Sequence, residues 1–237
     1  MTPRNASFHE GVLAGVLFGQ LKLAFAMLLG SAAVMALAWT IDWVCVFRVW
    51  PEGIEQLRNV LATDLANGIE LARRQGRTAG AITGTANFMY EVVFQATGIH
   101  EMGLRFAELG ALSLPDTIVR NTYIANQDAI EVAMIGTQLL GVRVATLALM
   151  LPLVILLYLI ATADGLSQRA IRRASGGRES ASLHHRAKYL QAAVGGTAVV
   201  SLLVWPAPVD WILTGFPMTG VLGGLARTQW TYFKKYM

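Results

Sequence analysis

The sequence predicts an all-α integral membrane protein with four transmembrane helices, the fourth of them short enough to be a re-entrant segment, and a helical exported region between spans 1 and 2. Hydrophobic residues make up 54% of the 237 residues and charged residues only 14%, whereas a soluble domain carries about 25% charged residues. Uncharged stretches near the roughly 20 residues that cross a bilayer recur along the chain. Basic residues gather beside those stretches, as they do on the cytoplasmic side of a membrane.

Residues 1–22 are predicted to form an amphipathic helix that leads into the first span. Ser7 and Glu10 have the spacing of a capping box, which marks the start of a helix. Glycines follow on one face of that helix, at Gly11, Gly15 and Gly19. Either the segment lies at the membrane interface, which is the favoured interpretation, or the glycine face allows close packing against another helix.

The predicted spans are residues 23–47 (TM1), 144–163 (TM2), 189–205 (TM3) and 209–226 (TM4). TM2 is twenty uncharged residues that include Pro152, and membrane helices tolerate such a proline. The apolar part of TM4 is only sixteen residues long and contains Pro217. TM4 is therefore the span that a re-entrant segment could replace.

Residues 48–143 are predicted to form an exported helical region. They contain eight basic and ten acidic residues, a net charge of −2. A helix is expected to start at Pro51, where apolar residues recur at helical spacing as far as Gly76. A second helical run covers residues 79–97, and the pattern from Ile118 is expected to continue without a break into TM2.

The short basic segments fix the expected orientation. The basic loop 164–188 holds six basic residues against two acids, and the basic tail 227–237 holds three basic residues and no acid. Positive residues in short connections stay on the cytoplasmic side. The prediction is a multi-pass protein of the bacterial inner membrane with both termini in the cytoplasm.

The sequence offers no catalytic, cofactor or metal motif, so a protein that is not an enzyme is expected. His184 and His185 are adjacent and point about 100° apart on a helix, which does not suit a shared metal. Asp42 and Asp210 stand at span borders, where acids are expected to cap helices or to be solvated. Gly220 and Gly224 have the G-x-x-x-G spacing of helix packing in TM4.

The basic loop carries the densest motif of the chain. Attraction to anionic headgroups needs only positive charge. In this segment, however, glycines, acids and histidines also stand in a particular order among the arginines. The predicted contacts with a partner or with lipid are Asp164, Arg169, Arg172, Arg173, Arg178, Glu179, Ser180, His185, Arg186 and Lys188.

The order of these residues resembles the integrating conjugative element membrane protein family, whose members are encoded in conjugative transfer clusters near the coupling ATPase. The resemblance extends over most of the chain. It is carried by the Trp50-Pro51-Glu52-Gly53 motif, Arg143, Pro152, Asp164-Gly165-Leu166, residues 177–180 and 185–188, and the ending Phe233-Lys234-Lys235-Tyr236.

The resemblance implies a noncatalytic inner-membrane subunit of a type IV secretion-like DNA transfer apparatus. Its expected partners are the coupling ATPase, other transfer proteins and anionic lipids; direct contact with nucleic acid is not expected, and a homo-oligomer is left open. Two other classes compete. An entry-exclusion or surface recognition protein would act through the exported region alone, and a small oligomeric transporter would need a buried polar site.

Overall fold

The computed structural model describes residues 3–108, 114–176 and 181–233, and in these ranges every regular element is a helix. The chain divides into two units, residues 1–37 and 38–237. The first unit is the greater part of α1 (Pro3–Val44), a helix without a marked polar face. Leu21, Phe25 and Leu28 of this unit are each more than half exposed, as expected for a helix surrounded by lipid.

The second unit begins with the last turns of α1 and continues with a series of helices. They are the π-helical turn η1 (Cys45–Val49), α2 (Ile54–Arg74), α3 (Gly80–Tyr90), the π-helical turn η2 (Glu91–Gln95), α4 (Ile99–Glu108), α5 (Leu114–Ala125), α6 (Gln127–Ala174), α7 (Ala181–Val204) and α8 (Trp211–Thr231).

Local sequence explains where several of these helices begin and end. Gly53 and Gly76 take positive φ values of 56° and 68° on either side of α2, a conformation that glycine adopts without strain. Asp210 caps α8, because its Oδ1 accepts hydrogen bonds from the N–H groups of Ile212 (2.9 Å) and Leu213 (3.0 Å). The expectation that Asp210 caps a helix is confirmed.

The expected unbroken helix from Ile118 into TM2 is wrong at one residue. Asn126 lies between α5 and α6 with φ −114° and ψ 13°, outside the helical region. Its side-chain Nδ2 donates to the carbonyl of Thr122 at 2.8 Å, which satisfies a group that the end of α5 leaves open. Beyond this break α6 runs for 48 residues, a length of about 72 Å.

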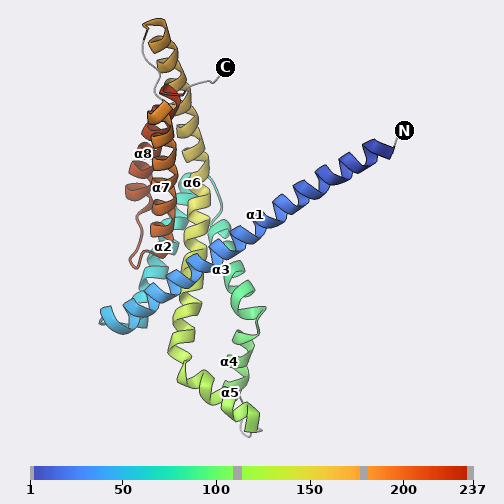
Figure 1. The fold of residues 1–237 in the computed structure, drawn as a ribbon. Helices are drawn as coiled ribbons and strands as arrows, with labels where there is room; N and C mark the ends of the chain where they lie inside the picture. The colour runs from blue at the N-terminus through green and yellow to red at the C-terminus, as the bar shows by residue number, and fades with distance from the viewer. Residues whose placement is uncertain (1–2, 109–113, 177–180, 234–237) are drawn as a thin grey trace. The chain divides into compact units, whose positions relative to one another are not determined.

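Helix α6 is the element on which the second unit is assembled. α2 and α3 pack against its first half, and α8 packs against its second half and also against α7. Figure 1 shows α6, α7 and α8 side by side as a three-helix bundle. Here the bundle means the second half of α6 together with α7 and α8.

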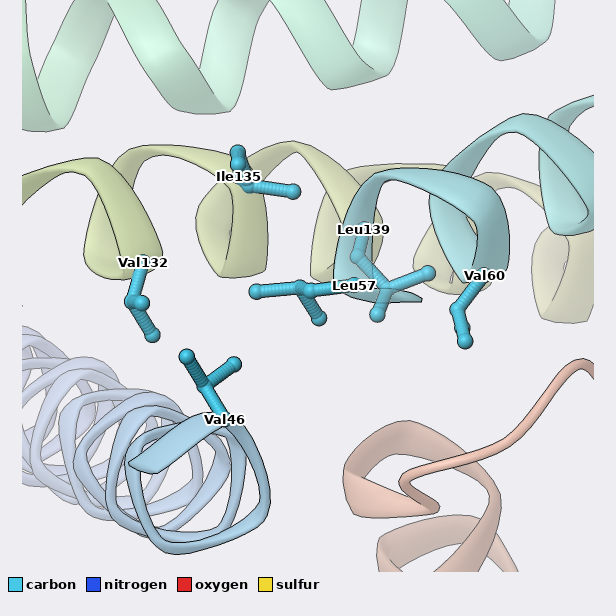
Figure 2. Close-up of a cluster of buried hydrophobic side chains, with 6 residues drawn as sticks. All are labelled: Val46, Leu57, Val60, Val132, Ile135 and Leu139. Carbon is cyan, nitrogen blue, oxygen red and sulfur yellow. The ribbon is translucent and has the colours of Figure 1, made fainter. Parts of the chain in front are cut away.

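Apolar contacts join the helices of the predicted exported region to α6. Leu57 and Val60 of α2 face Val132 and Leu139 of α6 and are nearly inaccessible to solvent, and Figure 2 shows this cluster with Val46 of η1 beside it. A second cluster joins α3 to α6, and its members are Ala72, Ile82, Ala86, Val142, Ala145 and Leu149. A third cluster lies where α8 begins and consists of Met150, Val209 and Trp211. The helical nature expected for residues 48–143 is confirmed over the described residues.

Within the described ranges, three helical segments are long and apolar enough to cross a membrane, which indicates a multi-pass membrane protein. They are Gly19–Val49, Gln127–Ala174 and Ser182–Val204. Leu151, Ile155 and Leu159 of α6 are each more than half exposed and form an outward apolar stripe. α8, the predicted TM4, does not meet this criterion, so a fourth span stays a prediction.

Much of the segment predicted as a basic loop is helical. α6 continues through Asp164 and ends only at Ala174, where Gly176 follows with φ 71°. α7 starts at Ala181. Residues 177–180, which include the predicted contacts Arg178, Glu179 and Ser180, lie outside the described residues.

Candidate functional site

The three helices of the bundle come together at the end that carries the arginines, here named the basic end: residues 164–174 of α6, 182–188 of α7 and 227–233 at the end of α8. Gly165 allows α8 to approach α6 closely, since a Cβ there would lie 2.6 Å from the carbonyl oxygen of Arg227. Asp164 forms an ion pair with Arg227 beside this contact. On α7, the His184 Nδ1 lies 2.8 Å from the carbonyl oxygen of Gln229, within hydrogen-bond distance. Residues from all three helices therefore lie at one level.

Two arginines of α6 lie over aromatic rings from the end of α8. The Arg172 guanidinium carbon is 4.2 Å from the centre of the Tyr232 ring, and that of Arg169 is 5.2 Å from the centre of the Phe233 ring. His184 meets Phe233 edge-on at 5.2 Å. These cation–π contacts orient both guanidinium groups within the chain.

The remaining predicted contacts at this end are at the surface. Arg173, His185, Arg186 and Lys188 are exposed. At the basic end the described residues carry six basic side chains, Arg169, Arg172, Arg173, Arg186, Lys188 and Arg227, against the single acid Asp164. The net charge of about +5 suits an anionic ligand or an acidic protein surface.

Three of the five predicted packing glycines make no close contact with another helix of this chain. Among the described residues, no atom outside their own helix lies within 4 Å of a Cβ built on Gly19, Gly220 or Gly224. The surroundings of Gly11 and Gly15 lie outside the described residues. The close approaches occur instead at Gly141, where a Cβ would lie 2.7 Å from the Cα of Ala86, and at Gly165. The packing role of the predicted glycines stays a prediction.

A buried ion pair, which the sequence analysis missed, lies at the opposite end of the bundle. Arg143 of α6 is 1% exposed and Asp64 of α2 is 0% exposed. The Arg143 Nε donates to Asp64 Oδ2 at 2.8 Å, and the other Asp64 oxygen accepts the N–H of Val209 at 2.7 Å. This carboxylate therefore joins α2 both to α6 and to the turn before α8.

The same arginine closes the turn between α7 and α8. Its Nη1 donates to the carbonyls of Leu203 (3.2 Å) and Trp205 (2.5 Å), and its Nη2 donates to the carbonyl of Ala207 (3.0 Å). Pro206 and Pro208 lie in this turn and cannot continue a helix. Arg143 thus satisfies carbonyls that the end of α7 leaves open. We name Arg143, Asp64 and residues 203–209 the polar clamp.

A second buried acid contradicts the sequence expectation. Asp42 is only 4% exposed, so the expectation that it is solvated is wrong. A Cβ on Gly136 of α6 would lie 2.6 Å from its Oδ2. Beside it the Trp39 Nε1 donates to Thr137 Oγ1 at 3.1 Å, so polar contacts accompany the packing of the last turns of α1 on α6.

The two polar regions hold their charged side chains in different surroundings. The polar clamp holds its charges by hydrogen bonds within the protein, whereas Arg173, Arg186 and Lys188 of the basic end are exposed. Among the described residues, no three histidine, cysteine or acidic side chains gather in a way that could hold a metal ion.

One comparison with known proteins identifies the family. The family model described as IncC plasmid conjugative DNA transfer protein DtrJ-like matches residues 49–234, a range that contains the polar clamp and the described residues of the basic end. Neither a curated protein nor a solved structure matches the chain. The expected part in conjugative DNA transfer is thereby confirmed, while the narrower assignment to integrating conjugative elements stays a prediction. The chain belongs to the DtrJ-like family of conjugative DNA transfer proteins.

Proposed function

We propose that the protein is a noncatalytic inner-membrane subunit of the conjugative DNA transfer apparatus and that it contacts the coupling ATPase through the basic end. Membership of a conjugative transfer family, together with the excess of basic side chains at one end of a bundle of apolar helices, carries this proposal. Exposed Arg173 and Arg186 offer planar forks that bind carboxylates in a bidentate way. An acidic surface of a partner protein would meet them there.

The proposed topology has four spans with both termini in the cytoplasm. α8 supports the fourth span because it is tied to α6 near both ends of TM2: its start lies beside the polar clamp, and Arg227 lies against Gly165. A helix that runs alongside a membrane-spanning helix over the whole length of the span also crosses the membrane. The basic end then lies in the cytoplasm, in line with the distribution of positive charge.

Reporter fusions test this topology. A fusion after Gly76 should be active only as a periplasmic reporter, and fusions after Gly177 and Met237 only as cytoplasmic reporters. A periplasmic Met237 fusion together with a cytoplasmic Gly177 fusion would mean that α8 does not return the chain to the cytoplasm.

Charge-preserving substitutions test the contact with the coupling ATPase. Lysine keeps the charge but loses the planar fork, so the combined variant Arg173→Lys, Arg178→Lys and Arg186→Lys should reduce both DNA transfer and co-purification with the ATPase. Arg77→Lys and Arg105→Lys, in the predicted exported region, form the matched control. Normal transfer and co-purification by the triple variant at wild-type abundance would show that the basic end acts through charge alone.

A groove in the exported region favours a second candidate, a surface recognition protein. It encloses about 560 Å³ between η2, α4, α5 and α6, and its lining is mainly apolar, with Phe94, Met102, Ile118, Tyr123 and Ile130 among the lining residues. Under this alternative, substitutions that remove the positive charges of the basic end would leave function intact. Substitution of Met102 or Tyr123 would abolish it.

A further inference from the structure

The three helices of the bundle leave an apolar space between α6 and α7. α7 packs along α8 and has few contacts with α6, so the two helices are joined mainly through α8. The space between them encloses about 500 Å³. Its walls come from residues 144–154 of α6 and 195–203 of α7, and its floor comes from residues 215–222 of α8. We name this space the α6–α7 furrow.

The lining of the furrow does not suit a polar ligand. Of the described residues that line it, only Thr219 has a polar side chain. Thr219 is 3% exposed, and its Oγ1 donates to the carbonyl of Phe216 at 2.8 Å. A peptide backbone or a row of waters placed here would lose hydrogen bonds that these side chains cannot replace. The lining therefore favours a hydrocarbon occupant.

The furrow is open to the side, toward the surroundings of the bundle. Val144 and Leu151 of α6 are 38% and 54% exposed, and Val199 of α7 is 37% exposed. All three residues lie in predicted spans, so the hydrocarbon chains of a bilayer can enter the furrow directly. If the furrow were left empty, its walls would lose dispersion contacts.

The length of the furrow matches one leaflet of a membrane. From Val144 to Val154 it extends about 15 Å along α6, which is half of the roughly 30 Å of a hydrocarbon core. One end lies at the polar clamp, since Leu203 lines the furrow and its carbonyl accepts a hydrogen bond from the Arg143 Nη1 at 3.2 Å. A chain with its headgroup at that end would reach the middle of the membrane.

The width of the furrow is too small for a helix. Spread over about 15 Å, the enclosed volume gives a mean cross-section of about 33 Å². A helix with its side chains is about 10–12 Å across and occupies about 80–110 Å². A helix of a second copy could lie across the opening but could not fill the space, whereas an unbranched acyl chain is narrow enough to do so.

We propose that the α6–α7 furrow binds an acyl chain of a phospholipid from the periplasmic leaflet, and that this chain completes the packing between α6 and α7. The inference rests on the proposed topology only in placing the furrow in the periplasmic half of the membrane. It does not depend on any contact with the coupling ATPase.

Photolabelling of the purified full-length protein tests this proposal. The protein is loaded with phosphatidylcholine that carries a diazirine near the end of one acyl chain, washed in detergent to remove loosely held lipid, and irradiated. Mass spectrometry then maps the labelled residues. The label should remain at Val154, Gly195 and Leu222, which line the inner end of the furrow, and should be lost from Ile155, which is exposed on the same helix as Val154. Loss of the label from all four residues would overturn the proposal.

Matched variants separate binding in the furrow from general contact with lipid. Ala148 is exposed and lines the furrow, so Ala148→Phe places a ring in it and should abolish the retained label. Val199→Phe fills the furrow from the other wall and should do the same. Ala193→Phe adds the same ring at an exposed position of α7 outside the lining and should keep the label. Retention of the label by Ala148→Phe or Val199→Phe would overturn the proposal.

Thermal unfolding tests the role of the chain in packing. Phosphatidylcholine added to the detergent-purified wild type should raise the unfolding temperature, because it joins α6 to α7. Ala148→Phe should lose this lipid-dependent shift, and Ala193→Phe should keep it. An equal shift in the two variants would contradict the packing role.

Two further measurements identify the occupant and keep this test apart from that of the proposed function. Native mass spectrometry should show the mass of a bound phospholipid; a bound free fatty acid, or a dimer whose furrow is shielded from the label, would overturn the proposal. The combined variant Arg173→Lys, Arg178→Lys and Arg186→Lys should keep the label at the furrow, whatever its effect on DNA transfer. Loss of the label in that variant would contradict the independence of the two sites.

Discussion

Removing the carboxylate of Asp64 should destabilise the protein more than any exposed charge on the same helix. Asp64 is fully buried and accepts hydrogen bonds from Arg143 and from the N–H of Val209. Asp64→Ala leaves a buried guanidinium without its counter-charge, and breaking a buried pair in this way costs about 3–5 kcal/mol. That is a large part of the 5–15 kcal/mol typical of folded proteins.

A double-mutant cycle measures the coupling within the polar clamp. Unfolding midpoints of Asp64→Leu, Arg143→Met and the double variant can be compared in detergent by tryptophan fluorescence. The double variant should be more stable than the sum of the single effects predicts, since an apolar pair leaves no lone buried charge. Full recovery is not expected, because the carbonyls of residues 203, 205 and 207 would lose the arginine.

Glu70→Ala is the matched control for this cycle. It removes a carboxylate from α2 that pairs with Arg73 and Arg74 at the surface, where ion pairs contribute little. If Asp64→Ala shifted the midpoint no more than Glu70→Ala does, the polar clamp would not stabilise the fold, and the reasoning from its burial would be refuted.

Two smaller predictions follow from the helix contacts. Gly141→Ala should push α3 away from α6 and lower stability by about 1–3 kcal/mol, whereas Gly84→Ala on the open side of α3 should be neutral or stabilising; equal thermal melts for the two variants would exclude the close approach. A hydrogen bond from Arg74 lowers the pKa of Glu70 below its ordinary value. The stabilisation of the folded state by the ionised Glu70 is therefore present above the ordinary pKa and is lost as the pH falls through the lowered pKa. Glu70→Gln should therefore weaken the acid-side decline of the unfolding midpoint, and an unchanged pH profile would contradict this.

Periodicity predicted the helices whose apolar faces pack locally. The apolar residues at helical spacing between Pro51 and Gly76 indicated the helix α2, and two of them, Leu57 and Val60, lie in the core. The uncharged run of residues 144–163 likewise predicted the second half of α6, including a helix that continues through Pro152. These features depend on neighbours within a few turns, and the sequence displays such neighbours directly.

The polar contacts could not be predicted in this way because they join distant positions. Arg143 and Asp64 are 79 residues apart. In the sequence, Arg143 stands directly before an apolar run and cannot be told from the basic residues that commonly flank a membrane span. The stacking of Arg172 on Tyr232 joins the ends of two different helices. Asp42 was misjudged for the same reason, since its burial depends on the close approach of Gly136.

The composition of the α7–α8 turn explains why a charged residue is buried beside it. Two prolines end the helical hydrogen bonding and leave the carbonyls of residues 203, 205 and 207 directed inward, where an apolar core would leave them unsatisfied at a cost of about 1–3 kcal/mol each. A guanidinium supplies N–H groups on three nitrogens in one plane, and an ammonium cannot reproduce that spread. The arginine in turn requires a carboxylate, and Asp64 on α2 provides it.

Any displacement of α2 along α6 must therefore carry the α7–α8 turn with it or break a buried ion pair, so the polar clamp mechanically couples the predicted exported helices to the bundle.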